Sequence, residues 1–265
     1  QYSAEVPDGA LVLTAGVDTQ DDRLEIEVVG WGEHEESYGI LRQTLWGDPG
    51  DPYTVEGSVW RALEAVLTKT FERADGSKMK ISSTCIDSGG HYTQAVYGFV
   101  KGREKRRVFA IKGMAGETRP IVTSPSQKKT GKQKRHVNLF TVGVDPAKTI
   151  VHSRLTLKDP GPGYCHFPIR EGYGANFFSE LTAEKRIKKF VQGFPKYVWV
   201  KIRGRRNESL DCRVYAMAAL YILNPIWEKL IEYWAGESAK AKKKTSVEAT
   251  AKLRKKKPKG FASNY

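Results

Sequence analysis

Three aspartates stand at points of the chain where an acidic side chain could carry out chemistry. Asp18 directly follows the apolar run Leu-Val-Leu-Thr-Ala-Gly-Val, and Asp87 ends the segment Lys-Ile-Ser-Ser-Thr-Cys-Ile before Ser-Gly-Gly. Asp211 lies near the start of a helical pattern, where helical spacing aligns it with Tyr215 and Ala218. A buried carboxylate on such a mostly apolar line is costly without a cation. We therefore expect these acids to bind a positive partner.

Carboxylate oxygens are hard ligands, which favour Mg²⁺ or Mn²⁺ over zinc. Several acids at one site can hold two such ions roughly 3.5–4 Å apart, an arrangement suited to phosphodiester cleavage. Each acid also has a plain structural explanation: Asp18 in a polar turn, Asp87 as a helix cap, Asp211 beside Glu208 at a helix N-terminus. The three positions together favour a metal centre and follow the order found in ribonuclease H-like nucleases, whereas each acid alone leaves both interpretations open.

Other chemistries find little support in the sequence. A Walker A motif ending at 131–132 would need glycine at position 126, which is Ser126, and neither G-x-G-x-x-G nor a nucleophile elbow occurs. The five histidines form no zinc-type pair, and Cys85, Cys165 and Cys212 share no close spacing, which argues against a disulfide framework and a cysteine zinc site. The longest apolar run, 214–223, is about half of what a membrane span needs, so we expect no membrane partner.

Positive charge is concentrated in a few segments. The 265 residues include 44 Lys or Arg against 30 Asp or Glu, a net charge of +14, and the segment 238–265 holds ten of these cations against one acid, Glu248. Such clusters predict a polyanion partner, because cations at phosphates release condensed counterions. Three further basic clusters lie at 101–107, 128–135 and 201–206. Our candidates for contacts with a phosphate backbone are Lys112, Arg203, Arg205 and Arg206.

These residues need an α/β scaffold, which the periodicity of apolar residues predicts. The expected strands are 11–17, 24–31, 36–46, 79–86, 107–111, 138–142 and 197–202. The expected helices are 59–71, 92–100, 146–155, 182–191 and 208–223, with an exposed loop at 113–136. An antiparallel meander followed by alternating strands and helices predicts a mixed sheet with flanking helices. We expect one domain over residues 1–227 and a basic tail, disordered or lightly helical, over 228–265.

Several motifs in register resemble the large terminase subunits of lambda-type tailed phages. The resemblance runs from about Gly16 to Leu223, and the matched region is that family's C-terminal nuclease domain. The motifs are Gly16-Val-Asp-Thr-Gln-Asp-Asp-Arg23, Cys85-Ile-Asp-Ser-Gly-Gly90, Phe109-Ala-Ile-Lys-Gly113, His166-Phe-Pro168, Leu181-Thr-Ala-Glu184 and Arg205-Arg-Asn-Glu-Ser-Leu-Asp-Cys212.

This resemblance implies a ribonuclease H-like fold that cuts double-stranded DNA during phage genome packaging, in the host cytoplasm. It implies that Asp18, Asp87 and Asp211 are catalytic and bind two Mg²⁺ or Mn²⁺ ions, with Asp18 bridging them, and that Glu208 supports these acids without binding metal. The implied partners are the terminase ATPase domain, the small terminase subunit and the portal. The family's ATPase motor is missing here and the chain begins at Gln1, so we expect a fragment of a longer protein.

Two other functions stay open on the sequence. The chain could bind DNA or a portal without cutting, since intact acids permit cleavage but do not require it. Actin-like phosphotransferases share the expected fold, and Ile86-Asp-Ser-Gly-Gly90 could pass for one of their phosphate loops. That alternative needs a second glycine-rich loop and does not predict a basic tail. Metal-dependent cleavage separates the nuclease from the binding module.

Overall fold

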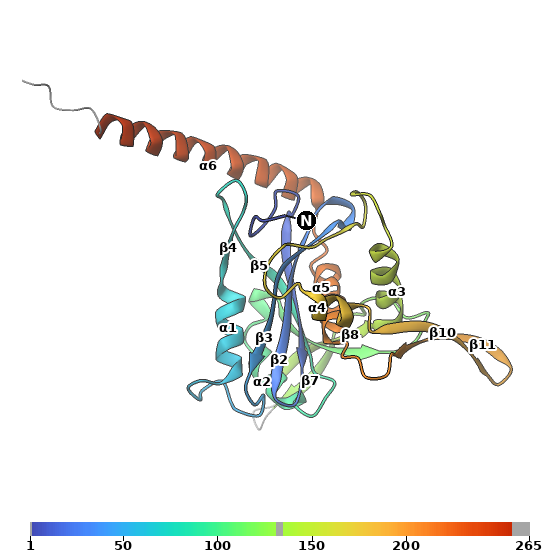
Figure 1. Ribbon diagram of the computed structural model, residues 1–265. Coiled ribbons are helices and arrows are strands. Elements are labelled where there is room, and N and C mark those ends of the chain that lie inside the picture. Colours follow the sequence, from blue (N-terminus) through green and yellow to red (C-terminus); the bar gives the residue numbers. More distant parts are fainter. Residues whose placement is uncertain (1, 131–134, 256–265) are drawn as a thin grey trace, which may run out of the picture.

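The computed structural model describes residues 2–130 and 135–255, and a mixed sheet forms its centre (Figure 1). Within this described part the sheet has nine strands, in the order β7-β8-β6-β5-β1-β2-β3-β9, with β4 beside β5. The strands are β1 (Val12–Thr19), β2 (Arg23–Trp31), β3 (Ser37–Trp46), β4 (Thr70–Glu72), β5 (Lys78–Asp87), β6 (Val108–Met114), β7 (Ser126–Thr130), β8 (Arg135–Gly143) and β9 (Cys165–His166). The expected mixed α/β sheet is thereby confirmed.

The directions of the strands decide where their ends meet. β1, β2 and β3 form an antiparallel meander, whereas β1, β5, β6 and β8 run parallel to one another. Parallel neighbours bring their carboxyl ends to one edge of the sheet, which is where ligands bind in open α/β sheets. The last residues of β1, β5 and β6 therefore share an edge.

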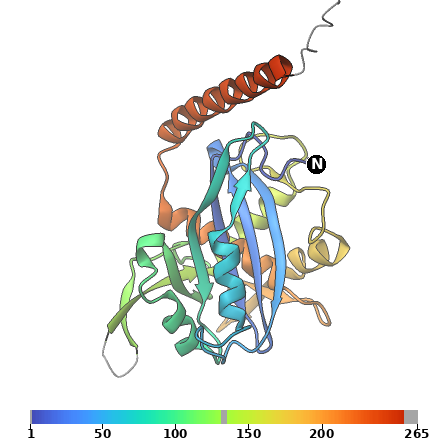
Figure 2. The same cartoon turned by 90° about the vertical axis from the view of Figure 1, so that its left-hand side faces the viewer.

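Helices cover both faces of the sheet (Figures 1 and 2). α1 (Val59–Thr68) and α2 (Thr93–Val100) pack on one face, in an apolar cluster with Leu13 and Val17 of β1. α3 (Val144–Leu155), α4 (Ala175–Leu181) and α5 (Glu208–Leu223) pack on the other, in a cluster with Val12. The alternation of side chains along a strand puts neighbouring residues on opposite faces, so both faces of β1 are buried.

The segment expected to be a disordered or lightly helical tail forms a long continuous helix, α6 (Trp227–Lys255), which extends away from the sheet (Figure 2). Its first turns are anchored, because Trp234 is buried and donates a 2.7 Å hydrogen bond from Nε1 to the carbonyl oxygen of Leu11. The Arg73 guanidinium lies over the Trp234 ring, and the Ser238 hydroxyl donates to Asp75. Residues 256–265 of the expected tail lie outside the described residues.

A second departure from the sequence prediction is the segment 182–191, where we expected a helix. It forms β10 (Glu184–Val191), which pairs antiparallel with β11 (Phe194–Lys201) in a separate two-stranded sheet. Gln192 and Gly193 join the strands with φ values of 52° and 81°, and positive φ at both central residues is the geometry of a tight hairpin turn. The turn and the strand pairing outweigh the local helical propensity of the lysines.

The segment 113–136, expected to be one exposed loop, includes the edge strand β7, which pairs with β8. Residues 131–134 of the basic cluster at 128–135 lie outside the described residues. No helix in the described ranges combines the length and apolar character that crossing a membrane requires.

Candidate active site

The three aspartates come together at the carboxyl edge of the sheet. Asp18 is next to last in β1 and Asp87 is last in β5, its parallel neighbour. Asp211 is in the first turn of α5, which lies directly against β1. This contact depends on Gly16, where an added Cβ would stand 2.0 Å from the carbonyl oxygen of Cys212. The structure therefore places the three predicted acids at the same edge of the sheet.

Burial and mutual repulsion shift the pKa values of these acids upward. Burial raises the pKa of Asp18 well above its usual value, and the charges of Asp211 and Asp87 raise it further. Burial also raises the pKa of Asp87 to about 6, although backbone N–H groups and Lys112 counteract this. Burial brings the pKa of Asp211 to about 6 as well, against the opposing charge of Lys148. The site thus holds more negative charge than its own cations neutralise.

Asp211 is held by a small polar network. Lys148 of α3 places Nζ 2.6 Å from Glu184 Oε1 and 3.5 Å from Asp211 Oδ1. Asn207 Nδ2 donates to Asp211 Oδ2 at 2.8 Å and to Glu184 Oε1 at 2.9 Å. Glu184 and Asn207 lie inside motifs that carried the family resemblance, which is the signal that could have identified them. Lys148 has no such signal in the sequence.

The donor set suits a hard divalent cation but is not a closed cage. Within residues 2–130 and 135–255, no three His, Cys, Asp or Glu side chains converge closely enough to hold a metal ion as they stand. Mg²⁺ is usually bound by one or two carboxylates together with water and substrate phosphate, so the buried Asp18 and the half-buried Asp87 and Asp211, oxygen-only acids with raised pKa values, fit such an ion. The Gln20 amide donates to Asp18 Oδ2 at 2.6 Å and orients that carboxylate.

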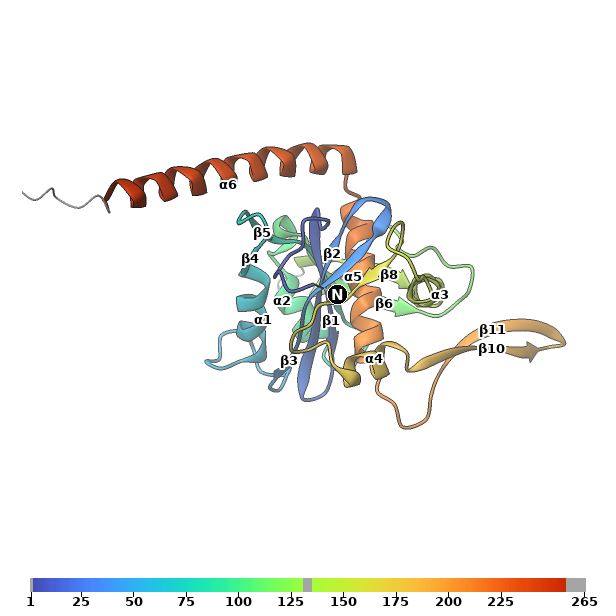
Figure 3. The same cartoon turned by 45° about the horizontal axis from the view of Figure 1, so that its top comes forward.

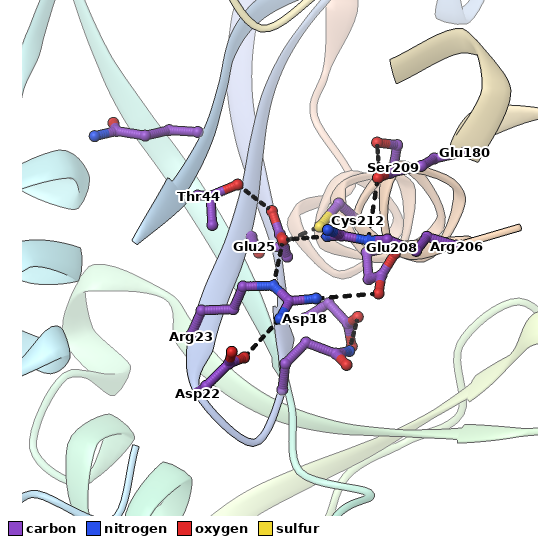
Figure 4. A network of polar contacts seen from close by, with 12 residues as sticks. Asp18, Asp22, Arg23, Glu25, Thr44, Glu180, Arg206, Glu208, Ser209 and Cys212 are labelled. Carbon is purple, nitrogen blue, oxygen red and sulfur yellow. Dashed lines mark hydrogen bonds and ion pairs between the residues drawn. The ribbon is translucent and has the colours of Figure 1, made fainter. Parts of the chain in front are cut away.

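A buried network of arginines and glutamates lies next to Asp18 (Figure 4). Glu25, which is fully buried, pairs with Arg23, Arg42 and Arg206, each at 2.7 Å. Burial alone would raise the pKa of Glu25, but Arg42 and its neighbours hold it below the usual value. Glu208 pairs with Arg23 at 3.4 Å and Arg206 at 3.1 Å. Glu208 is therefore fixed by arginines while its charge still contributes to the raised pKa of Asp18.

The four cations predicted to contact DNA take different positions. Lys112 is exposed on β6, close enough to Asp87 to lower its pKa. Arg203 and Arg205 are exposed in the loop between β11 and α5. Arg206 is half exposed, but its guanidinium is paired with glutamates. Lys112 is thus beside the acids, whereas much of the charge of Arg206 is neutralised within the protein.

This chain resembles known proteins along most of its length. Residues 1–231 match the family model described as "Terminase large subunit gpA, endonuclease domain". The chain is 40% identical over 232 residues to the terminase large subunit of Escherichia phage lambda and 34% identical over 235 residues to that of Enterobacteria phage P21. Each alignment covers 86% of this chain and 35% of the relative, so the chain spans about a third of the length of these curated relatives. No solved structure matches the chain.

Proposed function

This chain belongs to the family of terminase large subunit gpA endonuclease domains, and from that premise we propose that it cuts double-stranded DNA with the help of divalent metal ions. The observation that carries the proposal is the meeting of Asp18, Asp87 and Asp211 at one edge of the sheet. The antiparallel β1–β3 meander, the parallel β5, β6 and β8, and the acid on α5 support a ribonuclease H-like fold.

Asp18, Asp87 and Asp211 would hold two Mg²⁺ or Mn²⁺ ions. Ions bound there would activate a water for attack on the scissile phosphate and stabilise the leaving 3′ oxygen. The charges of both other acids act on Asp18, so Asp18 would be the central acid of the site. Gln20 orients Asp18, and Asn207 and Lys148 orient Asp211. Glu208 supports Asp18 from its place between two arginines.

Phosphate contacts from the chain would position the DNA without reading its sequence. Lys112 is suited to the strand being cut, because it lies beside Asp87. Arg203 and Arg205 are exposed at the start of α5 and suit phosphates further along the duplex. We give Arg206 a mixed role, in which its exposed half contacts DNA while its ion pairs hold the start of α5 in place.

We further propose that the domain works with an ATPase domain, a small terminase subunit and a portal, in the host cytoplasm during phage assembly. The support is the family membership and the share of its relatives, about two thirds, that this chain does not span.

A binding module without cleavage is the second candidate function. The observation in its favour is that, in the described residues, the acids do not form a closed metal cage and Lys148 lies at Asp211. Such a domain would bind DNA or the portal and would await its motor or another partner.

A plasmid cleavage assay decides between the nuclease and the binding module. The purified chain should convert supercoiled plasmid to nicked and linear forms with Mg²⁺ or Mn²⁺, and chelator or Asp18→Asn should abolish this. Asp159→Asn is the matched control, because Asp159 is exposed in the loop after α3. Cleavage by a folded Asp18→Asn variant at the wild-type rate would refute the site. Absent cleavage with salt-sensitive DNA binding would establish the binding module.

A further inference from the structure

The β10–β11 hairpin projects from the body of the molecule (Figures 1 and 3). Its eight paired positions run from Glu184 opposite Lys201 to Val191 opposite Phe194, so the ribbon is about 26 Å long at ~3.3 Å per residue. Neither the expected active-site acids nor the basic tail includes it. An isolated two-stranded hairpin is only marginally stable in water, so a ribbon that projects this far is expected to have a binding partner.

Positive charge covers this ribbon. Its cations are all exposed: Lys185, Arg186, Lys188, Lys189, Lys196 and Lys201. The single acid on the two strands, Glu184, is buried and paired with Lys148. Lys189 lies directly opposite Lys196, and like charges in such a pair destabilise a hairpin unless an anion neutralises them. The charge pattern is therefore unfavourable for the free protein and favourable for a polyanion partner.

Large apolar side chains stand at the tip of the ribbon. Phe190 is 68% exposed and Phe194 is 76% exposed, on either side of the Gln192–Gly193 turn. Phe190 and Phe194 are one position apart in the register, so their side chains lie on opposite faces of the ribbon. Exposed phenyl rings at the end of a cationic ribbon are suited to contact the apolar edges of bases, such as the thymine methyl group.

The base of the hairpin is fixed to the candidate active site. Glu184, at the start of β10, contacts Lys148 and Asn207, and Asn207 also donates to Asp211. On β11, the Trp199 indole donates to the carbonyl oxygen of Asp145 in α3 at 3.0 Å. A duplex lying along the ribbon would therefore lie beside the acids.

We propose that this hairpin is a DNA-binding arm that enters the major groove of a duplex next to the cleavage site. The inference rests on the proposed function, since it takes double-stranded DNA as the ligand. A two-stranded ribbon fits the major groove, about 12 Å wide. The lysines contact the phosphates on the two sides of the groove, and Phe190 and Phe194 contact base pairs within it.

The first test compares two triple variants in duplex binding, measured by fluorescence anisotropy in chelator across a salt series. Lys185→Ala, Lys189→Ala and Lys196→Ala remove three lysines that share one face of the ribbon. Lys78→Ala, Lys80→Ala and Lys158→Ala remove three exposed lysines that lie outside the basic clusters, two of them at the other end of β5 from Asp87. The hairpin variant should bind at least about 10-fold more weakly at low salt, and its salt slope should fall by about 2.7, which is ~0.9 per phosphate contact. The control should match wild type.

The second test removes the tip. Phe190→Ser with Phe194→Ser should weaken duplex binding several-fold but leave the salt slope unchanged, because a phenyl ring releases no counterion. A tip variant that binds like wild type would overturn entry into the groove.

The outcomes separate this arm from the nuclease proposal, because binding is measured without metal. If the hairpin triple variant keeps wild-type affinity and slope, the arm is overturned even where Asp18-dependent cleavage is intact. If the triple variant loses binding while the wild-type chain never cuts, the arm stands and the nuclease proposal fails. Polyglutamate could also be added as a competitor. If it displaces the labelled duplex as well as unlabelled duplex DNA does, the ribbon binds an acidic protein, and its role as a DNA arm is overturned.

Discussion

At the scale of single residues, the unusual feature is uncompensated negative charge around Asp18. Asp18 is only 5% exposed, and the charges of Asp211 and Asp87 repel its carboxylate. Asp18→Asn removes one of the repelling charges, so the metal-free variant should be more stable than wild type near pH 8. Thermal unfolding in chelator measures this.

Thermal unfolding with added metal should stabilise wild type more than Asp18→Asn. Mg²⁺ or Mn²⁺ should raise the melting temperature of wild type and of Asp159→Asn, because a ligand that binds the folded state stabilises it. Asp18→Asn should respond weakly. A wild-type melting temperature that ignores both metals, or an Asp18→Asn variant that is less stable in chelator, would contradict a metal centre built on these acids.

A second residue-scale prediction concerns the buried ion pair between Glu27 of β2 and Arg213 of α5. Arg213→Met leaves the Glu27 charge buried without its partner, which typically costs about 3–5 kcal/mol. Glu27→Gln combined with Arg213→Met should recover part of that loss, because no unpaired charge remains. Urea unfolding of wild type, the two single variants and the double variant gives the coupling free energy between Glu27 and Arg213. Strictly additive losses would show that the pair does not act as a unit.

The candidate acids could be identified from the sequence where they stand at the end of a strand or the start of a helix. Asp18 and Asp87 end apolar strands and Asp211 begins a helix, so their positions could be named. Glu25 and Glu27 alternate with apolar residues, a pattern typical of an exposed strand face, yet both are fully buried because α5 covers that face. Their partners come from segments remote in the chain, and no local pattern reports such pairing.

At the scale of elements, the site depends on how closely α5 approaches β1. Gly16→Ala would place a methyl group 2.0 Å from the Cys212 carbonyl oxygen and 2.5 Å from the Ala216 amide nitrogen. The helix must move away, so we expect a loss of several kcal/mol in stability. Cleavage should fall by at least about 100-fold, since a displacement near 1 Å can have that effect.

Gly98→Ala is the matched control for this prediction. Gly98 lies in α2 with open space where a Cβ would stand, so alanine there should stabilise the helix by up to about 1 kcal/mol. Urea unfolding and plasmid cleavage of both variants measure the contrast. A Gly16→Ala variant as stable and active as Gly98→Ala would show that the close contact is unimportant for the site.

Helices and strands were predicted correctly where the apolar periodicity was strong, and incorrectly where charged residues dominated the segment. The helix at 208–223 was predicted with its observed bounds, because a mostly apolar run between clear boundaries leaves few alternatives. The segment 184–191 has few apolar residues, and its strand pairing is decided by β11 across a turn that the local pattern did not predict. The edge strands β7 and β9 were missed for a related reason, since short edge strands carry little periodicity.

At the scale of the whole molecule, two elements extend from a compact sheet: the β10–β11 hairpin and α6. The hairpin is fixed to the edge of the sheet that holds the acids, whereas the first turns of α6 pack near the start of β1, beside Leu11. Because β1 ends at the acids, the two projections leave from opposite ends of that strand. The hairpin is therefore the projection placed to act on a substrate of the candidate active site.

The attachment of α6 to the body should respond to acid. Burial alone would raise the pKa of Asp75, but hydrogen bonds from Ser238 and Ser77 lower it to about 2. The unfolded chain keeps a value near 3.8, so the contribution of Asp75 to folding is present above pH ~4 and is lost as the pH falls towards 2. The shift corresponds to about 2 kcal/mol at neutral pH, at ~1.4 kcal/mol per pKa unit.

Asp75→Asn isolates this contribution. At pH 7 the variant should be less stable than wild type by about 2 kcal/mol in urea unfolding, and at pH 3 the difference should shrink to roughly half, because the wild-type carboxylate begins to protonate in both states. Limited proteolysis should cut α6 of the variant faster at pH 7, since Ser238 on α6 donates to Asp75. Trp234→Ala should release α6 equally at both pH values, because its burial and its hydrogen bond to Leu11 do not titrate. A stability difference between wild type and Asp75→Asn that stays constant from pH 7 to pH 3 would mean that the Asp75 carboxylate does not hold α6.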